Sequence, residues 1–367
     1  MVSTLDSHKA YWNDYDGLQR SKHRVLKRYL GGWYPILASS NERILYLDTH
    51  AGRGRHKYGE EGSPLVAVNT LINHQYKDKI LRNAEVNFIL FEIDERNCAL
   101  LKGEIDKLRP LPKNINIYDP ICSDFASELK TLLDDMEKED AKLAPSFAFI
   151  DPFGFGIPID LVNRVLNFRA CEVFINFMYR YIDMAMKNQV QENNMKMLFG
   201  TEEWRLLVNI EEPEERREQT CKLYVSQLNA KFISKIEMYG KHNQLKYILF
   251  HATNHSKGWW LMKEAIWYAI PDGSFRAYEK DRGEQFVLLK PEPDLTSFRA
   301  YVSEIFQGKN VHYGEIYNWM EDNRIMYLEK HLRSILKQLQ KEGLVEFAEY
   351  KGKLGLNLEK NPLIRFH

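Results

Sequence analysis

The sequence predicts an α/β protein whose core is a mostly parallel β-sheet with helices on both faces. Short, nearly continuous apolar segments alternate with helical segments along most of the chain, and this order is typical of parallel strands that are buried on both sides. Glycine, proline and acidic residues follow the ends of several apolar segments. The length of 367 residues predicts two or three domains, at the usual ~100–200 residues per domain.

The N-terminal part of the chain predicts helices followed by a strand. In residues 8–38, apolar residues recur at helical spacing, which predicts one or two amphipathic helices. Their polar face is expected to carry four basic residues, Lys22, Arg24, Lys27 and Arg28. The segment RILYLD predicts a strand that ends at Asp48. After a glycine-rich loop, a helix is expected to begin near Pro64, because proline is favoured in the first turn of a helix.

The following segments continue the alternation of strands and helices. Further strands are predicted at 86–94, 115–120, 146–150, 171–179 and 245–254. Further helices are predicted up to Leu108 and over 125–136, 158–168 and 259–270. The highly charged residues 180–245 are expected to form a helical insertion or cap. Together these elements form the predicted main domain.

A domain boundary is predicted in LLKPEPDLTS, which holds two prolines and a polar run and divides the chain into residues 1–290 and 295–367. Three helical segments follow, and LVEFAEYKGKLGLNL predicts a hairpin that turns at 351–353. Three helices and a two-stranded wing indicate a winged helix–turn–helix. Such domains bind DNA or RNA, here through Lys330, Arg333 and Lys337, but many bind proteins instead, and both alternatives stay open.

Charge and composition exclude several classes of protein. Lys+Arg and Asp+Glu both number 51, which excludes a polybasic nucleic-acid binder as a whole-chain description but not a local basic face. No apolar run reaches the ~18–20 residues that a membrane span needs, and the N-terminus lacks an apolar signal core. The four cysteines (Cys98, Cys122, Cys171 and Cys221) are far apart and form no CxxC pair. We therefore expect no disulfide framework, no metal site and a cytoplasmic location.

The first candidate site lies in LDTHAGRGR, where a strand ends at Asp48 and a glycine turn follows. Gly52 and Gly54 allow the backbone to approach a ligand where a Cβ would clash, which is typical of nucleotide-binding α/β proteins. An ordinary tight turn is the alternative interpretation.

Acidic residues follow the second and third strands. Glu92, or else Asp94, could accept hydrogen bonds from both hydroxyls of a ribose. Asp124 could accept a hydrogen bond from an adenine amino group, but it is equally suited to cap the helix that it precedes. A solvated strand-end carboxylate is the alternative for Glu92.

The fourth strand ends in the most specific segment, FIDPFGFG. Asp151 stands at the carboxyl end of this strand, where open α/β sheets bind their ligands, and Pro152 restricts Asp151 to extended conformations. Phe153 and Phe155 place aromatic rings beside these acceptors. The combination suits an exocyclic amine on a planar base, which donates hydrogen bonds while its ring stacks. Alternatively, Asp151 caps the next helix and the phenylalanines join the core.

Taken in this order, the segments resemble the Rossmann-like S-adenosylmethionine-dependent methyltransferases. LDTHAGRGR resembles their first motif, FEID their ribose acid, CSD their adenine-side acid and DPFG their catalytic turn. The last is similar to the Asp-Pro-Pro-Tyr turn of amino-methyltransferases, and closer to the Asp-Pro-Phe-Gly of tRNA guanine-N2 dimethyltransferases. The resemblance implies S-adenosyl-L-methionine as cofactor, held by Asp48, Ala51, Gly52, Gly54, Glu92, Asp94 and Asp124. It implies catalysis at Asp151, Pro152, Phe153 and Gly154.

More closely, the chain resembles the three-Cys-motif partner protein family. The matching segments are KHRVLKRYL, YLDTHAGRGRHKYGEEGSPLVA, FAFIDPFGFGIP, FINFMYR and HATNHSKGWWLMKEAIW. The resemblance implies a partner protein that carries three cysteines, since this chain has no such cluster.

One departure from ordinary methyltransferases is a charged loop, RGRHKYGEEG, which delays the helix after the glycines. Arg53 and Arg55 are thereby expected over the cofactor mouth, where they could contact a phosphate or carboxylate; a solvated basic loop is the alternative. Asn176 and Arg180, after the fifth strand, are expected to line the pocket or else to satisfy backbone groups.

The sequence as a whole predicts methyl transfer from S-adenosylmethionine to an exocyclic amino nitrogen of a nucleic-acid base. The alternative is a non-catalytic adaptor that keeps the pocket and serves a three-Cys-motif partner protein, or DNA. A hydrolase or nuclease is the weakest hypothesis, because the carboxylates are single strand-end residues and not a metal cluster.

Overall fold

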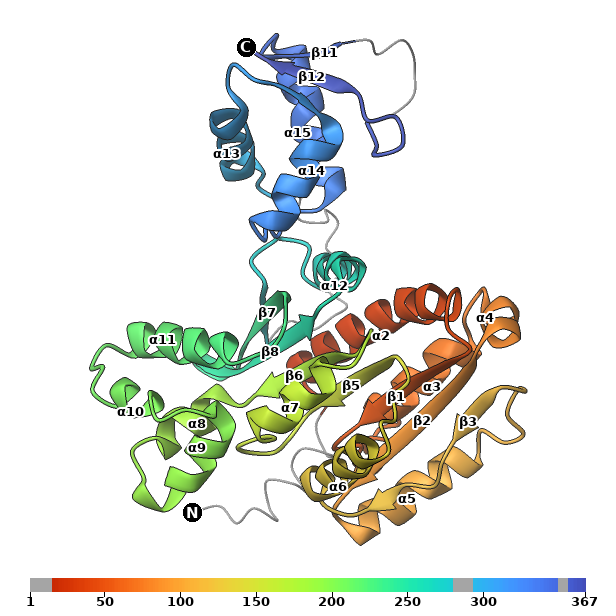
Figure 1. Cartoon of the computed structure of the whole chain (residues 1–367). Coiled ribbons are helices and arrows are strands. Elements are labelled where there is room, and N and C mark those ends of the chain that lie inside the picture. Colours follow the sequence, from red (N-terminus) through yellow and green to blue (C-terminus); the bar gives the residue numbers. More distant parts are fainter. Residues whose placement is uncertain (1–14, 280–292, 349–355) are drawn as a thin grey trace. The chain divides into compact units, whose positions relative to one another are not determined.

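The computed structural model describes residues 15–279, 293–348 and 356–367. The chain divides into two compact units, one over Met1–Ile270 and Phe275–Val287, the other over Pro271–Ser274 and Leu288–His367. Figure 1 labels helices and strands of both units.

The larger unit is built on a mixed sheet with the strand order β3-β2-β1-β5-β6-β8-β7-β9, and β4 pairs with β2 beside this path. Neighbours from β3 to β6 are parallel, whereas β8 is antiparallel to both β6 and β7. The strands are β1 Arg43–Asp48, β2 Glu85–Glu92, β3 Ile115–Ile117, β4 Ile121–Cys122, β5 Ser146–Ile150, β6 Glu172–Phe177, β7 Phe232–Tyr239, β8 Leu245–Thr253 and β9 Arg276–Tyr278. The predicted mostly parallel α/β sheet is therefore confirmed.

The order of the strands reverses between β1 and β5. From β1 the chain moves outward to β2 and β3, and it then returns to place β5 on the other side of β1. Such a reversal opens a crevice at the carboxyl ends of the two central strands, where α/β proteins bind ligands. The loops after Asp48 and Ile150 both begin at this crevice.

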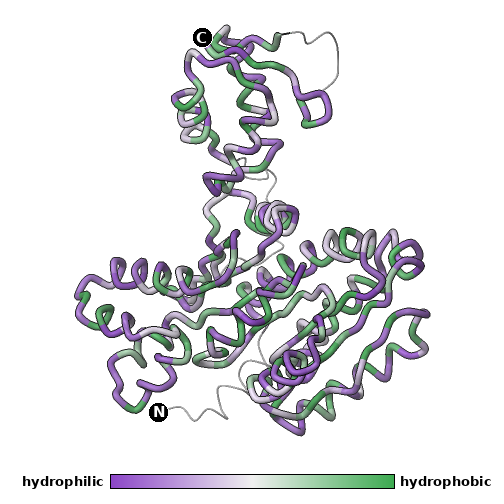
Figure 2. The backbone as a smooth tube through the Cα atoms, viewed as in Figure 1, coloured by the Kyte–Doolittle hydropathy of each residue, from purple (hydrophilic) through white to green (hydrophobic). Residues whose placement is uncertain are grey.

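Helices cover both faces of the sheet (Figure 1). On one face α2 packs against α3 and α12, and on the other α6 packs against α7. Hydrophobic residues run along the central strands, whereas the helices alternate between hydrophobic and hydrophilic residues (Figure 2). The helices are α2 Gly17–Ala38, α3 Ser63–Ile72, α4 Lys77–Asn83, α5 Glu95–Asp106, α6 Phe125–Lys138, α7 Ile159–Leu166 and α12 Ser256–Ala269.

The long helix α2 starts at an Asp16 N-cap, whose carboxylate accepts a hydrogen bond from the Gln19 backbone N–H at 2.8 Å. Its buried stripe includes Leu18, Val25 and Tyr29, and it also includes Lys22. The prediction that Lys22 lies on the polar face is therefore wrong. Lys22 is four residues after Leu18 and three before Val25, so helical spacing places it on the buried stripe.

Residues 180–245 are only partly the helical insertion that the sequence predicts. Four helices lie there, α8 Tyr179–Ala185, α9 Glu192–Phe199, α10 Trp204–Leu207 and α11 Pro213–Ser226. Residues 232–239, however, form strand β7 and extend the sheet. The alternation of buried side chains along this strand gives way to a continuous buried run at its end, which obscures the period of two that identifies a strand.

Among its described residues, the smaller unit holds three helices and a three-stranded antiparallel sheet with the order β10-β12-β11. Its elements are α13 Thr296–Phe306, β10 Asn310–His312, α14 Tyr313–Asp322, α15 Glu329–Lys341, β11 Val345–Ala348 and β12 Leu363–Phe366. The sequence predicts a hairpin over 344–358, but among the described residues β11 pairs with Leu363–Phe366 and not with 356–358. The predicted turn at 351–353 lies outside the described residues.

Candidate functional site

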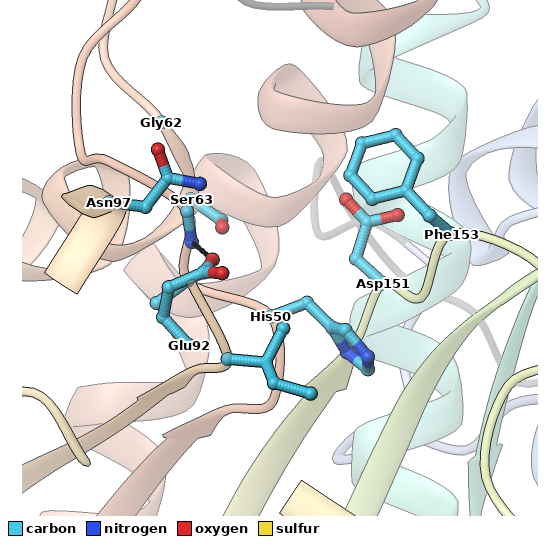
Figure 3. Close-up of a pocket in the computed structure, with 10 residues that line it drawn as sticks. His50, Gly62, Ser63, Glu92, Asn97, Asp151 and Phe153 are labelled. Carbon is cyan, nitrogen blue, oxygen red and sulfur yellow. Dashed lines mark hydrogen bonds between the residues drawn. The ribbon is translucent and has the colours of Figure 1, made fainter. Parts of the chain in front are cut away.

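A pocket of about 290 Å³ opens at the carboxyl ends of the central strands. This volume is near the lower end of the ~300–1,000 Å³ of typical small-molecule sites. Glu92 and Asp151 lie on opposite sides of it (Figure 3). The lining residues are His50, Ala51, Gly52, Gly62, Ser63, Glu92, Ile93, Asn97, Asp151 and Phe153.

The glycine loop between β1 and α3 forms one wall of the pocket. Gly52 and Gly54 have φ values of 63° and 84°, in the left-handed region that favours glycine. A Cβ on Gly54 would also lie 3.0 Å from the Leu101 side chain. The loop folds back on itself, since the Gly62 N–H donates to the Gly54 carbonyl at 2.8 Å. These contacts bring the backbone of Ala51 and Gly52 to the pocket surface.

Glu92, at the end of β2, is fixed by backbone donors. Its Oε2 accepts a hydrogen bond from the Gly52 N–H at 2.8 Å, and its Oε1 accepts one from the Asp94 N–H at 2.9 Å. A carboxylate oxygen has two lone pairs, so each oxygen retains one for a ligand. The neighbouring Ile93 side chain is 67% exposed and lines the pocket. A carboxylate beside an exposed aliphatic side chain suits a sugar with two hydroxyls attached to a planar ring.

The other two predicted acids cap helices. Asp94 accepts a hydrogen bond from the Asn97 N–H at 2.8 Å, and Asp124 accepts one from the Ser127 N–H at 2.9 Å. Neither is among the residues that line the pocket. The capping alternative for Asp124 is thus what the structure contains, and ligand binding by either residue stays a prediction.

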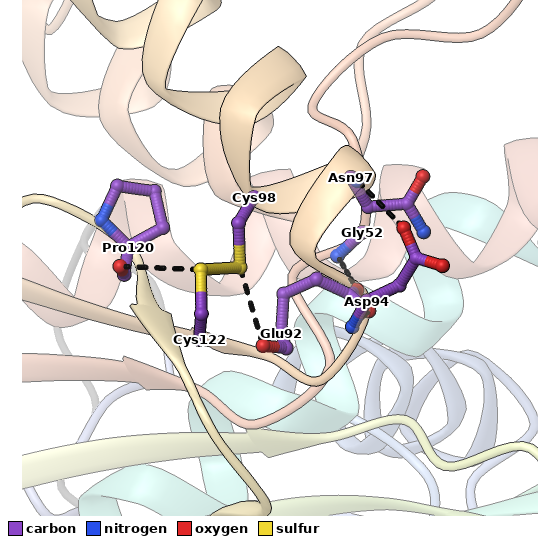
Figure 4. Close-up of a disulfide and its surroundings, with 7 residues drawn as sticks. All are labelled: Gly52, Glu92, Asp94, Asn97, Cys98, Pro120 and Cys122. Atoms are coloured by element: carbon purple, nitrogen blue, oxygen red, sulfur yellow. Dashed lines mark hydrogen bonds between the residues drawn. A yellow bond between two sulfur atoms is a disulfide. The ribbon is translucent and has the colours of Figure 1, made fainter.

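A disulfide lies directly behind Glu92 and joins Cys98 of α5 to Cys122 of β4 (Figure 4). The expectation that no cysteines pair is therefore wrong for these two. Cys122 is the strand partner of Glu92, and Cys98 lies on the first turns of α5 next to the pocket residue Asn97. Their contact depends on the pairing of β4 with β2, which spacing in the sequence does not reveal. The disulfide links the two segments on either side of the Glu92 backbone.

The opposite wall is formed by Asp151, directly after β5. Its Oδ2 forms an ion pair with the Lys22 ammonium of α2, and its Oδ1 accepts a hydrogen bond from the Asn176 amide at 2.7 Å. Burial alone would raise the pKa of Asp151, but the Lys22 ammonium and these hydrogen bonds outweigh it and hold the pKa below its usual value. Asp151 is therefore a carboxylate at neutral pH.

Two further titratable groups lie near the pocket with shifted pKa values. Asp48 is fully buried, and this burial raises its pKa to about 7. It accepts hydrogen bonds from the Tyr46 hydroxyl at 3.2 Å and the His50 N–H at 3.3 Å, and it does not line the pocket. Burial lowers the pKa of His50 to about 4, so the imidazole that lines the pocket is neutral at pH 7.

Some residues of the turn after Asp151 line the pocket and others pack on the core. Phe153 is 48% exposed and lines the pocket, whereas Phe155 packs on the core and against the Tyr181 ring at 5.0 Å. Gly154 has a φ of 109°, which a side chain rarely adopts. Pro152 is buried. The prediction of two rings beside the acceptor therefore holds for the placement of Phe153 and is wrong for that of Phe155.

The predicted basic residues lie away from the pocket lining. Arg55 forms an ion pair with Glu104 at 3.0 Å and donates to the Gly59 carbonyl at 2.7 Å, so it braces the loop. Arg53 donates to the Arg55 carbonyl at 3.1 Å. Arg180 is exposed on α8. Of the predicted substrate-side polar residues, Asn176 reaches the site through its hydrogen bond to Asp151.

Sequence reasoning missed several pocket residues. His50, Ser63 and Asn97 line the pocket, and each belongs to a segment that begins at the carboxyl end of a strand, which is the signal that could have identified them. Lys22 does not line the pocket but contacts Asp151, and its role was missed because the lysine was assigned to the polar face of its helix.

Within residues 15–279, 293–348 and 356–367, no three potential ligating side chains gather into a metal site. Across the same described residues, no helix is long and apolar enough to cross a bilayer.

No family model matches the sequence, and no curated protein matches it. A putative O-methyltransferase from Klebsiella pneumoniae matches in structure with 11% identity over 69% of this chain and 97% of that one, at a TM-score of 0.32. An O-methyltransferase from Bacillus cereus matches with 11% identity over 68% and 88%, at 0.33. Human methyltransferase-like protein 13 matches with 11% identity over 69% and 92%, at 0.33.

Likeness at this level does not assign an activity. The mixed sheet, parallel over most of its strands and with a reversal of strand order at its centre, is that of a doubly wound α/β fold.

Proposed function

We propose that this protein is an S-adenosylmethionine-dependent methyltransferase that acts on an exocyclic amino nitrogen of a nucleic-acid base. The observation that carries the proposal is the placement of Glu92 and Asp151 on opposite sides of one pocket at the reversal of strand order (Figure 3). One side offers ribose recognition and the other offers a carboxylate for the acceptor. The bound cofactor supplies an electrophilic methyl group on a sulfonium.

The residues on the glycine-loop side fit the adenosyl part of this cofactor. Glu92 retains lone pairs for the ribose hydroxyls, and the Ile93 side chain offers an apolar surface for the adenine ring. A Cβ on Gly54 would meet the Leu101 and Glu104 side chains of α5, so glycine lets the loop lie against α5 while Gly52 lines the pocket. Asn97 adds an amide that can donate or accept at the same wall.

On the other side, Asp151 and Phe153 suit an aromatic amine. The carboxylate keeps unused lone pairs after it has accepted from Lys22 and Asn176. It can therefore accept an N–H from the amine and stabilise the positive charge that develops on nitrogen during transfer. The exposed ring of Phe153 offers a stacking surface for the base. Catalysis would consist mainly of placement.

The smaller unit is proposed to be a winged helix that brings nucleic acid to the larger one. Lys330 and Lys337 are exposed on α15, while Arg333 forms an ion pair with Glu329 at 3.2 Å. Exposed lysines on one helix can contact phosphates. Replacing both with glutamate should weaken binding to DNA or RNA, measured by fluorescence anisotropy at fixed salt.

The test of the proposed function combines two measurements on the full chain. Titration calorimetry with S-adenosylmethionine is expected to show binding that Glu92→Gln weakens. Incubation with the tritiated-methyl cofactor is then expected to label DNA or tRNA. Binding with no label in DNA, tRNA or a three-Cys-motif partner protein would favour the adaptor, for which the supporting observation is that each Asp151 oxygen already has a partner within the chain. Absence of cofactor binding would refute both.

A further inference from the structure

The Asp151 carboxylate is held by two buried side chains from distant parts of the chain. Lys22 approaches from α2 and Asn176 from the end of β6, and they are 2% and 6% exposed. Burying an ammonium group is costly unless it is paired. The fold therefore commits Lys22 to this carboxylate, although α2 has exposed positions for lysine, such as Lys27.

The surroundings of Lys22 keep its ammonium in place. The Phe149 and Tyr247 ring centroids lie 5.8 Å and 6.0 Å from Nζ, within the range of cation–π attraction. Lys22 is not among the residues that line the pocket. It must therefore influence a ligand through Asp151 and not by direct contact.

We propose that Lys22 is the positioning residue of this site: its ammonium fixes the orientation of the Asp151 carboxylate and makes the two side chains an electrically neutral pair. The part of this proposal in which Lys22 orients Asp151 rests on their contact alone. A consequence for the acceptor rests on the function proposed above. An unpaired carboxylate would attract a protonated alkylamine. Because Lys22 already supplies the positive partner of Asp151, the site instead favours a neutral amine, which keeps its nitrogen lone pair.

The electrostatics predict what removal of Lys22 would do. Burial raises the pKa of Asp151, and the Lys22 charge is the largest effect that opposes burial. Without Lys22, the pKa of Asp151 should rise. Among the described residues, titratable groups that interact with this carboxylate also include His23 on α2, Tyr46 and Asp48 on β1, and His50 in the glycine loop.

The first test measures Asp151 directly, by NMR titration of the full chain with ¹³C-labelled aspartate carboxyls, and it needs no substrate. The Asp151 signal is identified by its loss in Asp151→Asn. In Lys22→Met its midpoint should rise by about one pH unit or more, which is a tenfold change in proton affinity. Lys22→Arg should change it less, and the matched control Lys27→Met should leave it unchanged. An unchanged midpoint in Lys22→Met would overturn the proposal.

A second measurement covers the case in which Lys22→Met does not fold. The double variant Lys22→Met/Asp151→Asn removes both charges, so it should melt at a higher temperature than Lys22→Met alone. Equal melting temperatures, or a folded single variant that melts at a higher temperature than the double variant, would contradict a stabilising role for the Lys22–Asp151 pair. If the single variant is unfolded, a folded double variant supports the pairing, and an equally unfolded double variant overturns it.

A third measurement separates this proposal from the proposed function. Where wild-type protein transfers tritiated methyl groups, Lys22→Met should lose turnover at low pH and recover it at high pH, with cofactor affinity unchanged. Loss at all pH values would reject the positioning role. If wild-type protein labels no acceptor, the proposed function fails, while the NMR titration still decides the role of Lys22.

Discussion

The two sides of the pocket are built from different kinds of contact. Glu92 is fixed by backbone N–H groups of Gly52 and Asp94, which stay in place as long as the loop keeps its path. Asp151 is fixed by side chains, and one of them, Lys22, lies 129 residues away along the chain. Backbone donors survive most substitutions, whereas each side-chain donor can be lost through one. The acceptor side should therefore be the more easily damaged of the two.

The largest effect is expected from Asp151→Asn. Loss of the carboxylate removes the charge that stabilises the developing cationic nitrogen, so turnover should fall by about 100-fold or more. Cofactor affinity should change little, because Glu92 and the glycine loop are untouched. Tritiated-methyl transfer and calorimetry measure the two quantities, with Asp160→Asn, an exposed carboxylate on α7, as control. Equal losses of binding and turnover would contradict the division of the pocket into two sides.

The complementary change is Glu92→Gln. Hydrogen bonds to a charged group contribute about 1.5–3 kcal/mol, so affinity for S-adenosylmethionine should fall about tenfold to 100-fold. Turnover at saturating cofactor should be largely kept. Calorimetry and transfer assays at raised cofactor concentration check both expectations. Normal affinity in this variant would remove Glu92 from the cofactor site.

The difference between the two sides also explains which parts of the site could be predicted from the sequence. Gly52, Glu92 and Asp151 follow strand ends, and the rule that parallel strands bind ligands at their carboxyl ends predicts that they gather. Lys22 is different, because a lysine in an amphipathic helix is assigned to the polar face unless its partner is known. The Cys98–Cys122 pair is equally hidden, since it depends on the register of β4 against β2. Long-range pairing is the information that local patterns lack.

A smaller effect is expected from Gly54→Ala, which tests the glycine loop alone. A side chain at a φ of 84° costs about 1–2 kcal/mol, and the new Cβ would also meet the Leu101 side chain at 3.0 Å. Gly59→Ala is the matched control, since its φ of 99° imposes similar strain with nothing within 4 Å. Both variants should melt at a lower temperature, and Gly54→Ala should also weaken cofactor binding several-fold. Equal affinities in the two variants would exclude a role for the loop's close packing.

A still smaller effect is expected from reducing the Cys98–Cys122 disulfide, which braces the segments around Glu92. The backbone hydrogen bonds to Glu92 remain, so affinity for S-adenosylmethionine should fall only a few-fold. Cys122→Ser should show the lower affinity with or without a reducing agent, and the control Cys221→Ser, a free cysteine, should respond as the wild type does. A wild-type affinity that is insensitive to reduction would show that the backbone contacts suffice alone.

The last prediction concerns the pH dependence of stability, through Asp48, and leaves cofactor binding aside. Its pKa rises from 3.8 to about 7 in the folded protein, so between these pH values the folded state holds a proton that the unfolded state has released. Stability contributed by this group is therefore present at low pH and lost as the pH rises towards 7, with a slope of at most about 1.4 kcal/mol per pH unit. Asp48→Asn cannot ionise, so it should lose less stability than the wild type between pH 5 and 7.5, as urea unfolding at the two pH values would measure. An identical loss in both proteins would mean that Asp48 is already ionised at pH 5. The buried carboxyl end of β1 would then carry a negative charge next to the Lys22–Asp151 pair.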